Sequence, residues 1–300
     1  MVRPPTRRAL HNVRRRLLAW YGLQHRDFPW RSTRDPYAVL VSEVMLQQTQ
    51  AARIAERFPR FMARFPTAAT LAAASSAEVL TEWAGLGYNR RALALQRAAA
   101  AVTERGWPAD VEGLEALPGV GPYTARALAS LAFNRPAGVV DTNVRRWLVR
   151  RFRATDTPRA LQSLADALAT AATDGAAAEW THATMEFGAA VCRPRAPRCD
   201  ACPIAAGCPS RDAPPAVGVP RQARLHGSDR AYRGAVIRAL AEVDGHALPV
   251  KELRRRTADE RVGPALDDGG WDRILAALEV DGLVQRGRGV VRLGAATIGP

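Results

Sequence analysis

The sequence predicts a mainly α-helical protein that ends in a small unit of helices and strands. Apolar residues recur at helical spacing from about residue 11 to residue 191, and no strand-rich region or internal repeat precedes residue 209. Residues 283–293 instead read as two short strands around a glycine and arginine turn, after three further helical segments. Three helices followed by a hairpin predict a winged-helix-like domain over residues 228–294.

Composition shifts divide the chain into four parts. Residues 1–10 form a basic arm that we expect to be poorly ordered. A helical domain is predicted over residues 11–209, and residues 210–227 read as a linker because Pro, Gly, Ala and Arg occur there without periodicity. A chain of 300 residues, 47% of them hydrophobic, is long enough for two domains with cores of their own.

The charge of the chain indicates an acidic partner. The formal net charge is +14, and Lys251 is the only lysine, so 42 of the 43 basic residues are arginine. A positive excess of this size favours nucleic acid, although a solvated basic surface is the plainer interpretation. No apolar run reaches membrane-spanning length, and the N-terminus lacks a signal-peptide core. We therefore expect a cytoplasmic, nucleoid-associated protein without a membrane partner.

A glycine hairpin, Gly119-Val120-Gly121, precedes a predicted helix in the middle of the chain. A turn this tight is expected to need φ > 0, which glycine adopts without strain. Pro122 then suits the first turn of the next helix, where a missing N–H costs nothing. Backbone amides at such a helix start can bind phosphate, so the hairpin predicts a grip on a nucleic-acid backbone, with Asp141 behind it.

Glu43 lies in the middle of a helix that is predicted to open near Pro36. Val39-Leu40-Val41 and Val44-Met45-Leu46 bracket it, so the helix is apolar nearly all round and should be buried. A buried carboxylate is costly unless it has partners or is protonated, and a raised pKa is what a proton donor needs. The residues alone leave two readings, a structurally satisfied glutamate and a catalytic acid.

Two loops combine aromatic rings with arginines. Residues 26–31 hold two rings and two arginines, a mixture that suits stacking on bases and contact with phosphate. The turn at residues 85–88 presents Tyr88 between two helices, next to two more arginines. Each loop has a plainer interpretation, which is a packed loop in the first case and a helix cap with a buried tyrosine in the second.

The four cysteines of the chain are clustered in one short loop, as Cys192, Cys199, Cys202 and Cys208. In a chain with no secretory signal this clustering argues for a metal rather than for disulfides. Zinc and an iron–sulfur cluster both accept four thiolates, and the spacing favours neither. The same loop carries Arg193, Arg195 and Arg198, which predict phosphate contacts; a purely structural metal without a DNA contact is the alternative.

Together these motifs closely resemble the helix-hairpin-helix DNA glycosylases with a cluster loop, specifically the MutY-type adenine DNA glycosylases. The resemblance covers about residues 11–209. It rests on Phe28-Pro29-Trp30-Arg31, Ser42 to Thr49, Gly85-Leu86-Gly87-Tyr88, Leu117 to Gly121, Asp141-Thr142-Asn143-Val144 and the cysteine quartet. It implies a two-lobed helix-hairpin-helix DNA glycosylase fold, a [4Fe–4S] cluster in the cysteine loop and double-stranded DNA as the partner of a monomer.

The resemblance also assigns catalytic roles. Glu43 would protonate the departing base and later position water. Asp141 would stabilise positive charge at the sugar carbon, either by its charge alone or through a covalent intermediate. Tyr123 stands near the sugar where such enzymes carry Tyr or Ser, and Asn143 would hold Asp141. This logic parallels glycoside hydrolysis by two carboxylates, with a nucleobase as the leaving group.

The remaining roles concern the flipped base. Gln48 and Tyr88 would enter the base stack while adenine leaves it. The pocket that receives adenine would be formed by Arg26, Trp30, Arg31, Leu46 and Glu186. The function implied is base excision repair by a monofunctional glycosylase that removes adenine mispaired with 8-oxoguanine or guanine.

Three alternatives accompany this interpretation. A lyase like endonuclease III needs a lysine at the position of Tyr123 to form a Schiff base, and no lysine precedes Lys251. A thymine or uracil mismatch glycosylase can share the hairpin, Tyr123, Asp141 and the cluster. A non-catalytic lesion-binding protein requires neither carboxylate. The chain also departs from typical adenine glycosylases, because residues 228–294 do not resemble their C-terminal domain for reading 8-oxoguanine.

Overall fold

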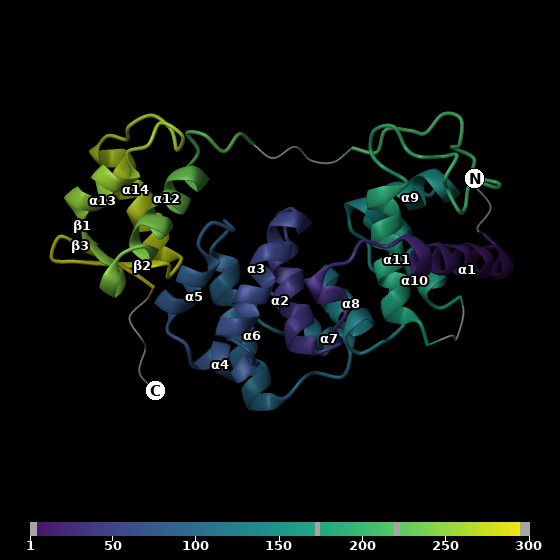
Figure 1. Cartoon of the computed structure of the whole chain (residues 1–300), viewed down its shortest axis with the longest axis horizontal. Coiled ribbons are helices and arrows are strands. Elements are labelled where there is room, and N and C mark those ends of the chain that lie inside the picture. The colour runs from purple at the N-terminus through teal and green to yellow at the C-terminus, as the bar shows by residue number, and fades with distance from the viewer. Residues whose placement is uncertain (1–4, 172–174, 219–222, 295–300) are drawn as a thin grey trace. The chain divides into compact units, whose positions relative to one another are not determined.

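The computed structural model describes residues 5–171, 175–218 and 223–294 (Figure 1). The chain forms two compact units. The first unit comprises Met1–Glu43 and Trp107–Pro220, and the second comprises Val44–Gly106 and Arg221–Pro300. By contacts, therefore, the C-terminal residues belong with 44–106, while the boundaries expected at residues 209 and 228 stay a prediction.

Within the described residues of the first unit, helices joined by loops are the regular secondary structure. Helix α1 begins at Arg7, capped by the Thr6 side chain, so residues 7–10 belong to a helix and not to the predicted basic arm. Residues 1–4 of that arm lie outside the described residues. Helix α11 contacts α1, α8 and α9. The elements are α1 (Arg7–Gln24), the 3₁₀ turn η1 (Pro29–Arg31), α2 (Pro36–Leu46), α7 (Val111–Glu115), α8 (Pro122–Leu131), α9 (Thr142–Phe152), α10 (Pro158–Ala169) and α11 (Ala177–Ala190). The last turn of α2, from Val44, belongs to the second unit.

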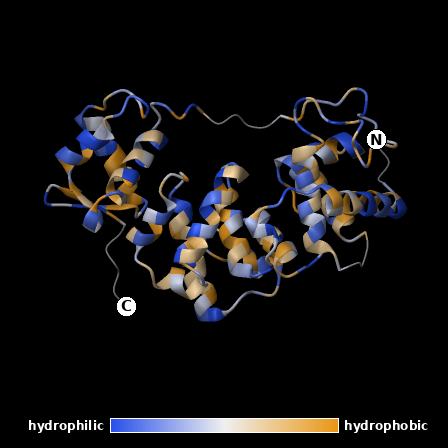
Figure 2. Ribbon diagram, in the orientation of Figure 1, coloured by the Kyte–Doolittle hydropathy of each residue, from blue (hydrophilic) through white to orange (hydrophobic). Residues whose placement is uncertain are grey.

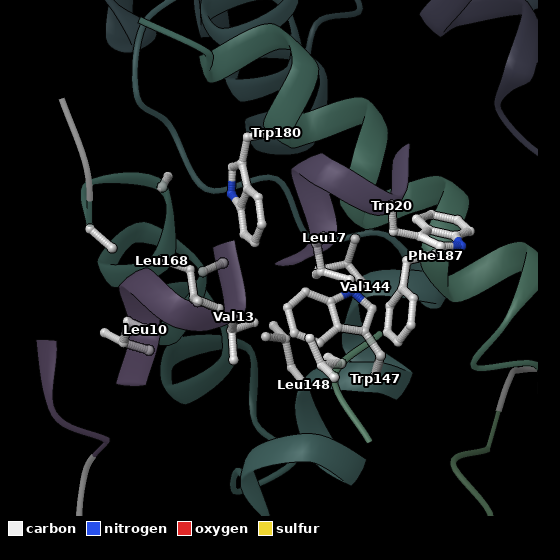
Figure 3. Close-up of a cluster of buried hydrophobic side chains, with 14 of the residues drawn as sticks. Leu10, Val13, Leu17, Trp20, Val144, Trp147, Leu148, Leu168, Trp180 and Phe187 are labelled. Atoms are coloured by element: carbon white, nitrogen blue, oxygen red, sulfur yellow. The ribbon is translucent and has the colours of Figure 1, made fainter. Parts of the chain in front are cut away.

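One hydrophobic cluster holds this unit together (Figure 3). Leu17 of α1, Trp147 of α9 and Phe187 of α11 lie in it, and the two aromatic rings meet edge to face with centroids 5.9 Å apart. Burial of aromatic side chains of this size supplies a large part of the folding free energy. The cluster therefore fixes α9, whose first turn carries Asp141 and Asn143, against α11.

The second unit combines four helices with the C-terminal segment. Its sheet has the order β1-β3-β2 and is antiparallel, with Val284 opposite Leu293 and Ala247 opposite Arg292. The predicted hairpin is therefore present, and β1 is a third strand that the sequence did not suggest. The elements are α3 (Ala51–Arg64), α4 (Ala68–Ala73), α5 (Ser76–Trp83), α6 (Arg90–Arg105), α12 (Asp229–Ala241), η2 (Asp244–His246), β1 (Ala247–Pro249), α13 (Val250–Thr257), α14 (Asp268–Val280), β2 (Val284–Gly287) and β3 (Val290–Leu293).

The C-terminal segment packs on α5 and α6. Helix α12 and strand β3 both contact α5. Gly294 lies so close to Ser76 and Ala77 that a β-carbon there would come within 3.0 Å of both residues. Lys251 is exposed on α13. The segment is thus an integral part of the second unit.

The helices carry both hydrophobic and hydrophilic residues along their lengths (Figure 2). Within the described parts of the chain, none of the helices has the length and apolar character needed to cross a membrane.

Candidate active site and DNA-contacting turns

Glu43 is buried in α2, as its apolar surroundings predict. Only 4% of the residue is exposed, and Val39, Leu40 and Val44 are buried with it. The pKa of Glu43 is raised to about 7, mainly by burial and in addition by the negative charge of Asp141. A hydrogen bond from Tyr123 opposes this shift. Glu43 is therefore a carboxyl group that can hold a proton near neutral pH.

The hairpin delivers Tyr123 to this carboxyl group. Helix α8 begins at Pro122, directly after the hairpin, as predicted. Gly119 has φ +75°, which glycine favours, but Gly121 has φ −96°, so the expectation of left-handed backbone is wrong at that position. The amide of Val120 donates to the carbonyl of Leu117 at 3.0 Å. The Val120 amide, which was predicted to bind phosphate, thus forms a hydrogen bond within the turn.

Asp141 is the N-cap residue of α9. Its Oδ1 accepts a hydrogen bond of 2.6 Å from the Val144 amide, and its Oδ2 accepts one of 2.8 Å from Asn143 Nδ2. Burial raises the pKa of Asp141, and these hydrogen bonds with the charge of Arg146 lower it in part. The structure therefore contains the contact through which Asn143 was expected to hold Asp141, and both oxygens have a fixed direction.

Arg146 supports Asn143 from behind, a role that the sequence did not suggest. Its Nη2 donates to Asn143 Oδ1 at 2.8 Å and to the carbonyl of Gly188 at 2.6 Å, and its Nε donates to the carbonyl of Cys192 at 2.7 Å. Gly188 leaves no room between α11 and α9, because a β-carbon there would lie 2.6 Å from the Asn143 carbonyl oxygen. One buried guanidinium thus joins Asn143 to the start of the cysteine loop.

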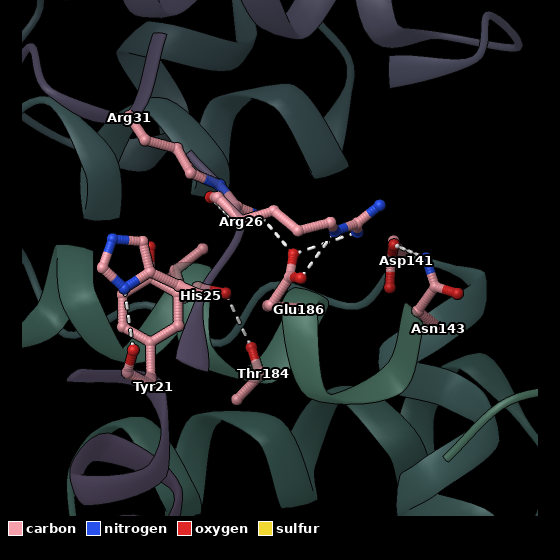
Figure 4. Close-up of polar contacts among 9 residues, drawn as sticks. Tyr21, His25, Arg26, Arg31, Asp141, Asn143, Thr184 and Glu186 are labelled. Atoms are coloured by element: carbon pink, nitrogen blue, oxygen red, sulfur yellow. Dashed lines mark hydrogen bonds and ion pairs between the residues drawn. The ribbon is translucent and has the colours of Figure 1, made fainter. Parts of the chain in front are cut away.

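Glu186 of α11 forms a second carboxylate centre with Arg26 and Arg31 (Figure 4). Arg26 donates to both oxygens at 2.6 and 3.0 Å, and Arg31 Nη2 donates to Oε2 at 2.7 Å. Burial opposes ionisation of Glu186, but the hydrogen bonds and charges of the two arginines outweigh it and lower its pKa. Glu186 is therefore an ionised acceptor and not a proton donor.

The aromatic loop packs on itself. Trp30 is buried and stacks on Phe28 with ring centroids 4.8 Å apart. The guanidinium groups of Arg26 and Arg31 lie 5.2 and 5.0 Å from the centre of the Phe28 ring. The structure thus brings Arg26, Trp30, Arg31 and Glu186 together in the first unit, with the rings packed against one another as the plainer interpretation expected.

A stack of Tyr21, His25 and His182 lies beside this centre, and the sequence did not suggest it. The Tyr21 ring stacks on His25 at 4.8 Å and on His182 at 6.4 Å, and Arg31 lies over it at 5.9 Å. Burial lowers the pKa of His182 to about 3, with help from Arg31 and Arg34. His182 is therefore neutral and packs on the Tyr21 ring, over which Arg31 lies. Only helical spacing, four residues from Glu186 on α11, could have pointed to it.

Gln48 and Tyr88 occupy two turns of the second unit. Helix α2 ends at Leu46, so Gln48 lies in the turn that follows the helix. Both residues have left-handed backbone, with φ +56° for Gln48 and +48° for Tyr88. Strained backbone of this kind is concentrated at ligand-contacting positions. Leu46 is the last residue of α2 and lies at the start of the same turn.

A single guanidinium connects the two turns. Arg91 Nη1 donates to the carbonyls of Val44 and Gln47 at 2.5 and 2.8 Å, and its Nη2 donates to the carbonyl of Gly87 at 3.0 Å. Burial lowers the pKa of Arg91 to about 10. The spacing of the turns is therefore fixed by a partly buried guanidinium, a role that the sequence did not suggest.

The four cysteines line one pocket of the first unit, with Trp147 and Phe187 among the apolar walls. Arg150 of α9 donates to the carbonyls of Arg193 and Pro194, at 2.6 and 3.1 Å, and lies 3.7 Å from the Cys192 sulfur. Burial raises the pKa of Cys202 to about 11, and the other three thiols raise it as well. Zinc and iron–sulfur clusters both bind cysteine thiolates, so the four cysteines that line this pocket have the donor chemistry of a metal site.

The described residues contain no set of three or more Cys, His, Asp or Glu side chains arranged for a single metal ion.

The arginines of the cysteine loop differ in their exposure to solvent. Arg195 and Arg198 are exposed, whereas Arg193 turns back to donate to the carbonyl of Ala196 at 2.8 Å. Arg195 and Arg198 thus keep the exposure that their predicted phosphate contacts require.

The comparisons with known proteins agree with this arrangement. Residues 41–170 match the family model of the HhH-GPD superfamily base excision DNA repair proteins. Adenine DNA glycosylase of Mycobacterium tuberculosis is 41% identical over 280 residues, which cover 90% of this chain and 89% of that protein. Since residues 1–227 are only about three quarters of the chain, this likeness extends into the C-terminal segment.

Solved structures show the same fold. A thermostable thymine-DNA glycosylase has a TM-score of 0.62 and 29% identity, covering 67% of this chain and 96% of that chain. Endonuclease III in a non-covalent DNA complex has a TM-score of 0.59 and 23% identity, covering 69% and 97%. The two-lobed helix-hairpin-helix fold is thus confirmed, and the chain belongs to the MutY-type adenine DNA glycosylase family of the helix-hairpin-helix superfamily.

Proposed function

We propose that this protein is a monofunctional adenine DNA glycosylase that acts on adenine opposite 8-oxoguanine or guanine. The observation that carries the proposal is the buried Glu43, which is hydrogen-bonded to Tyr123 beside Asp141 and has a pKa near 7. Two carboxyl groups in different environments are the requirement for breaking a glycosidic bond.

Glu43 acts as the acid. Adenine is a poor leaving group as an anion, so Glu43 donates its proton to a ring nitrogen while the bond between the sugar carbon and adenine breaks. Asp141, held by Asn143 and the Val144 amide, stabilises the positive charge that develops on the sugar. Water then adds to the sugar carbon and returns a proton to the Glu43 carboxylate. The products are free adenine and an abasic site.

Tyr123 determines the fate of the strand once the base has left. Its pKa is raised well above the ordinary value, first by burial and then by the charges of Glu43 and Asp141, so it stays a neutral hydroxyl group. A phenol forms no Schiff base with the sugar, and the described helices α8 and α9 carry no lysine. The abasic strand is therefore left uncut, and borohydride should trap no covalent complex.

The cysteine loop is proposed to hold a [4Fe–4S] cluster through Cys192, Cys199, Cys202 and Cys208. Support comes from the single pocket that the four thiols share and from the family to which the chain belongs. When bound, the cluster would tie together a loop that exposes Arg195 and Arg198 to phosphate. Assays for iron, acid-labile sulfide and zinc on the purified protein should give four irons and four sulfides per chain, with no stoichiometric zinc.

The partner is double-stranded DNA that contains a mispair, and we propose that a monomer binds it. The net charge of +14 and the exposed arginines favour a DNA-bound, nucleoid location. The base opposite adenine is proposed from the family resemblance alone, because residues 228–294 do not resemble the domain that reads 8-oxoguanine in typical adenine glycosylases.

The decisive experiment is single-turnover excision on a panel of duplexes. These hold A opposite 8-oxoguanine, A opposite G, T opposite G, U opposite G, or hypoxanthine, and alkali reveals abasic sites as strand breaks. We expect breaks at both adenine mispairs, and none before alkali. Breaks only at T or U would make the protein a mismatch glycosylase like its structural neighbour. No break with any duplex would make it a lesion-binding protein.

A further inference from the structure

Tyr88 is held by a residue from the far end of the chain. Arg230, in the first turn of α12, donates from Nη1 to the Tyr88 hydroxyl oxygen at 2.6 Å, and its guanidinium lies 5.4 Å from the ring centre. Arg91 lies 5.6 Å from the same ring centre. Tyr88 is 37% exposed, so these contacts orient a side chain that also faces solvent.

The position of Arg230 follows from the docking of the C-terminal segment. Asp281, after α14, pairs with Arg233 of α12 and lies 3.5 Å from Arg90 of α6. The close packing of Gly294 on α5 fixes the same segment at another point. Arg230 is therefore delivered to Tyr88 by a docked domain and not by a loose tail.

Arg230 also lines a pocket with both turns. The pocket has a cavity volume of about 410 Å³, within the roughly 300–1,000 Å³ range typical of small-molecule sites. Its lining includes Gln47, Gln48, Tyr88, Arg91, Arg230 and Arg233. Amide and guanidinium donors around an aromatic ring suit contact with DNA bases and phosphates. The C-terminal segment thus contributes to the surface that carries Gln48 and Tyr88.

We propose that Arg230 is a positioning residue for base extrusion: it orients Tyr88, the side chain that enters the base stack. The C-terminal segment would then take part in base extrusion. This inference rests on the proposed function, in which Tyr88 enters the base stack. A tyrosine that must fill the space left by adenine loses less rotational freedom on binding if its hydroxyl group is already held. A charged donor also holds that oxygen more strongly than a neutral one.

The test uses the full-length protein and a double-mutant cycle. Arg230→Ala removes the donor, Tyr88→Phe removes only the acceptor oxygen, and the double variant removes both. Single-turnover excision is measured with adenine opposite 8-oxoguanine, opposite G, and opposite a tetrahydrofuran abasic analogue. Extrusion of adenine costs least when adenine has no pairing partner. If a variant is slow because extrusion is impaired, its loss of excision rate should therefore be smaller on the duplex with the abasic analogue.

We expect Arg230→Ala and Tyr88→Phe each to slow excision about ten-fold opposite G, as loss of one charged hydrogen bond would. The double variant should be no slower than either single variant, and the defect opposite the abasic analogue should fall below about two-fold. Arg230→Lys should recover part of the rate. The matched control is Arg238→Ala, which removes the same charge from an exposed position of α12 and should leave the rate unchanged.

Equal slowing on all three duplexes, or additive effects in the double variant, would overturn the inference. If Arg230→Ala misfolds, as judged by thermal melting, Tyr88→Phe alone decides the matter, because it removes one oxygen atom. A wild-type rate for Tyr88→Phe on every duplex would then reject the role of Arg230. Failure of the proposed function is a separate result, since it would appear as no adenine excision by the wild-type protein.

Discussion

Glu43 and Glu186 are both buried glutamates of the first unit, yet their environments drive their pKa values in opposite directions. Glu43 lies among apolar side chains with one neutral hydroxyl donor, and burial raises its pKa to about 7. Glu186 has side-chain oxygens with no exposed surface, but two arginines hold it and its pKa is lowered. Burial alone therefore does not make an acid, and the absence of a cation beside Glu43 among the described contacts is what separates the two.

The largest expected effect is on chemistry at Glu43. Glu43→Gln keeps the shape of the side chain but cannot donate a proton to adenine, so excision should fall by about 10²–10⁴-fold. Binding to an uncleavable duplex should change little, which gel-shift titration checks. Glu186→Gln is the matched variant in the same unit, and the comparison fails if it slows the chemical step as much as Glu43→Gln does.

Asp141→Asn should come next, with a loss of about 10²–10³-fold in single-turnover rate because the charge opposite the sugar disappears. Asparagine is a good N-cap residue, so α9 should keep its start and the melting temperature should change little. Asp141→Ala removes both the charge and the cap, and it should lower the melting temperature as well. A near-normal rate for Asp141→Asn would show that the charge is not required.

Stability should reveal the raised pKa of Glu43 directly. The unfolded state ionises this group near pH 4.5 and the folded state only near pH 7, so the wild type loses stability as pH rises between these values. Glu43→Gln lacks this penalty. We expect it to be more stable than the wild type by on the order of 3 kcal/mol at pH 8, and equal to it near pH 4. Denaturant unfolding of both proteins across this range measures the difference, and parallel curves would contradict the raised pKa.

The smallest effect is expected for Glu186→Gln, which should lower the stability of the protein where Glu43→Gln raises it. Glu186→Gln removes the negative partner of two arginines. Arg31, with only 11% of its side chain exposed, is left as a largely buried charge without that partner, whereas Arg26 is 54% exposed and water screens its charge. We expect a loss of about 1–3 kcal/mol at pH 7. Since the pKa of Glu186 is lowered, this stabilisation is present above pH 4.5 and is lost as pH falls further. Unfolding curves that converge at acid pH would support this, and a constant difference would not.

The burial of Glu43 could be predicted because apolar residues surround it in the sequence. The start of α8 at Pro122 and of α9 after Asp141 followed from local capping preferences. These features depend on neighbours in the chain. The hydrogen bond between Tyr123 and Glu43 joins residues eighty positions apart, and only the family resemblance suggested that they meet.

The direction of arginine side chains could not be predicted. Nothing in the sequence distinguishes Arg146 and Arg150 of α9 from exposed arginines, but both are buried and donate to carbonyls of the cysteine loop. Arg91 likewise turns inward to the carbonyls of two turns. The composition gives the net charge, but it does not show which guanidinium groups are bound to backbone carbonyls within the fold. The net charge of +14 therefore overstates the positive charge that is exposed for contact with DNA.

The scarcity of lysine has a practical consequence for experiments on this protein. Lys251 is exposed on α13, and with the N-terminal amine it offers the only targets for amine-reactive dyes. A fluorophore on Lys251 would report distances from the C-terminal segment to labelled DNA without disturbing the cysteines. Energy transfer can thus test whether this segment stays docked while the protein acts on DNA.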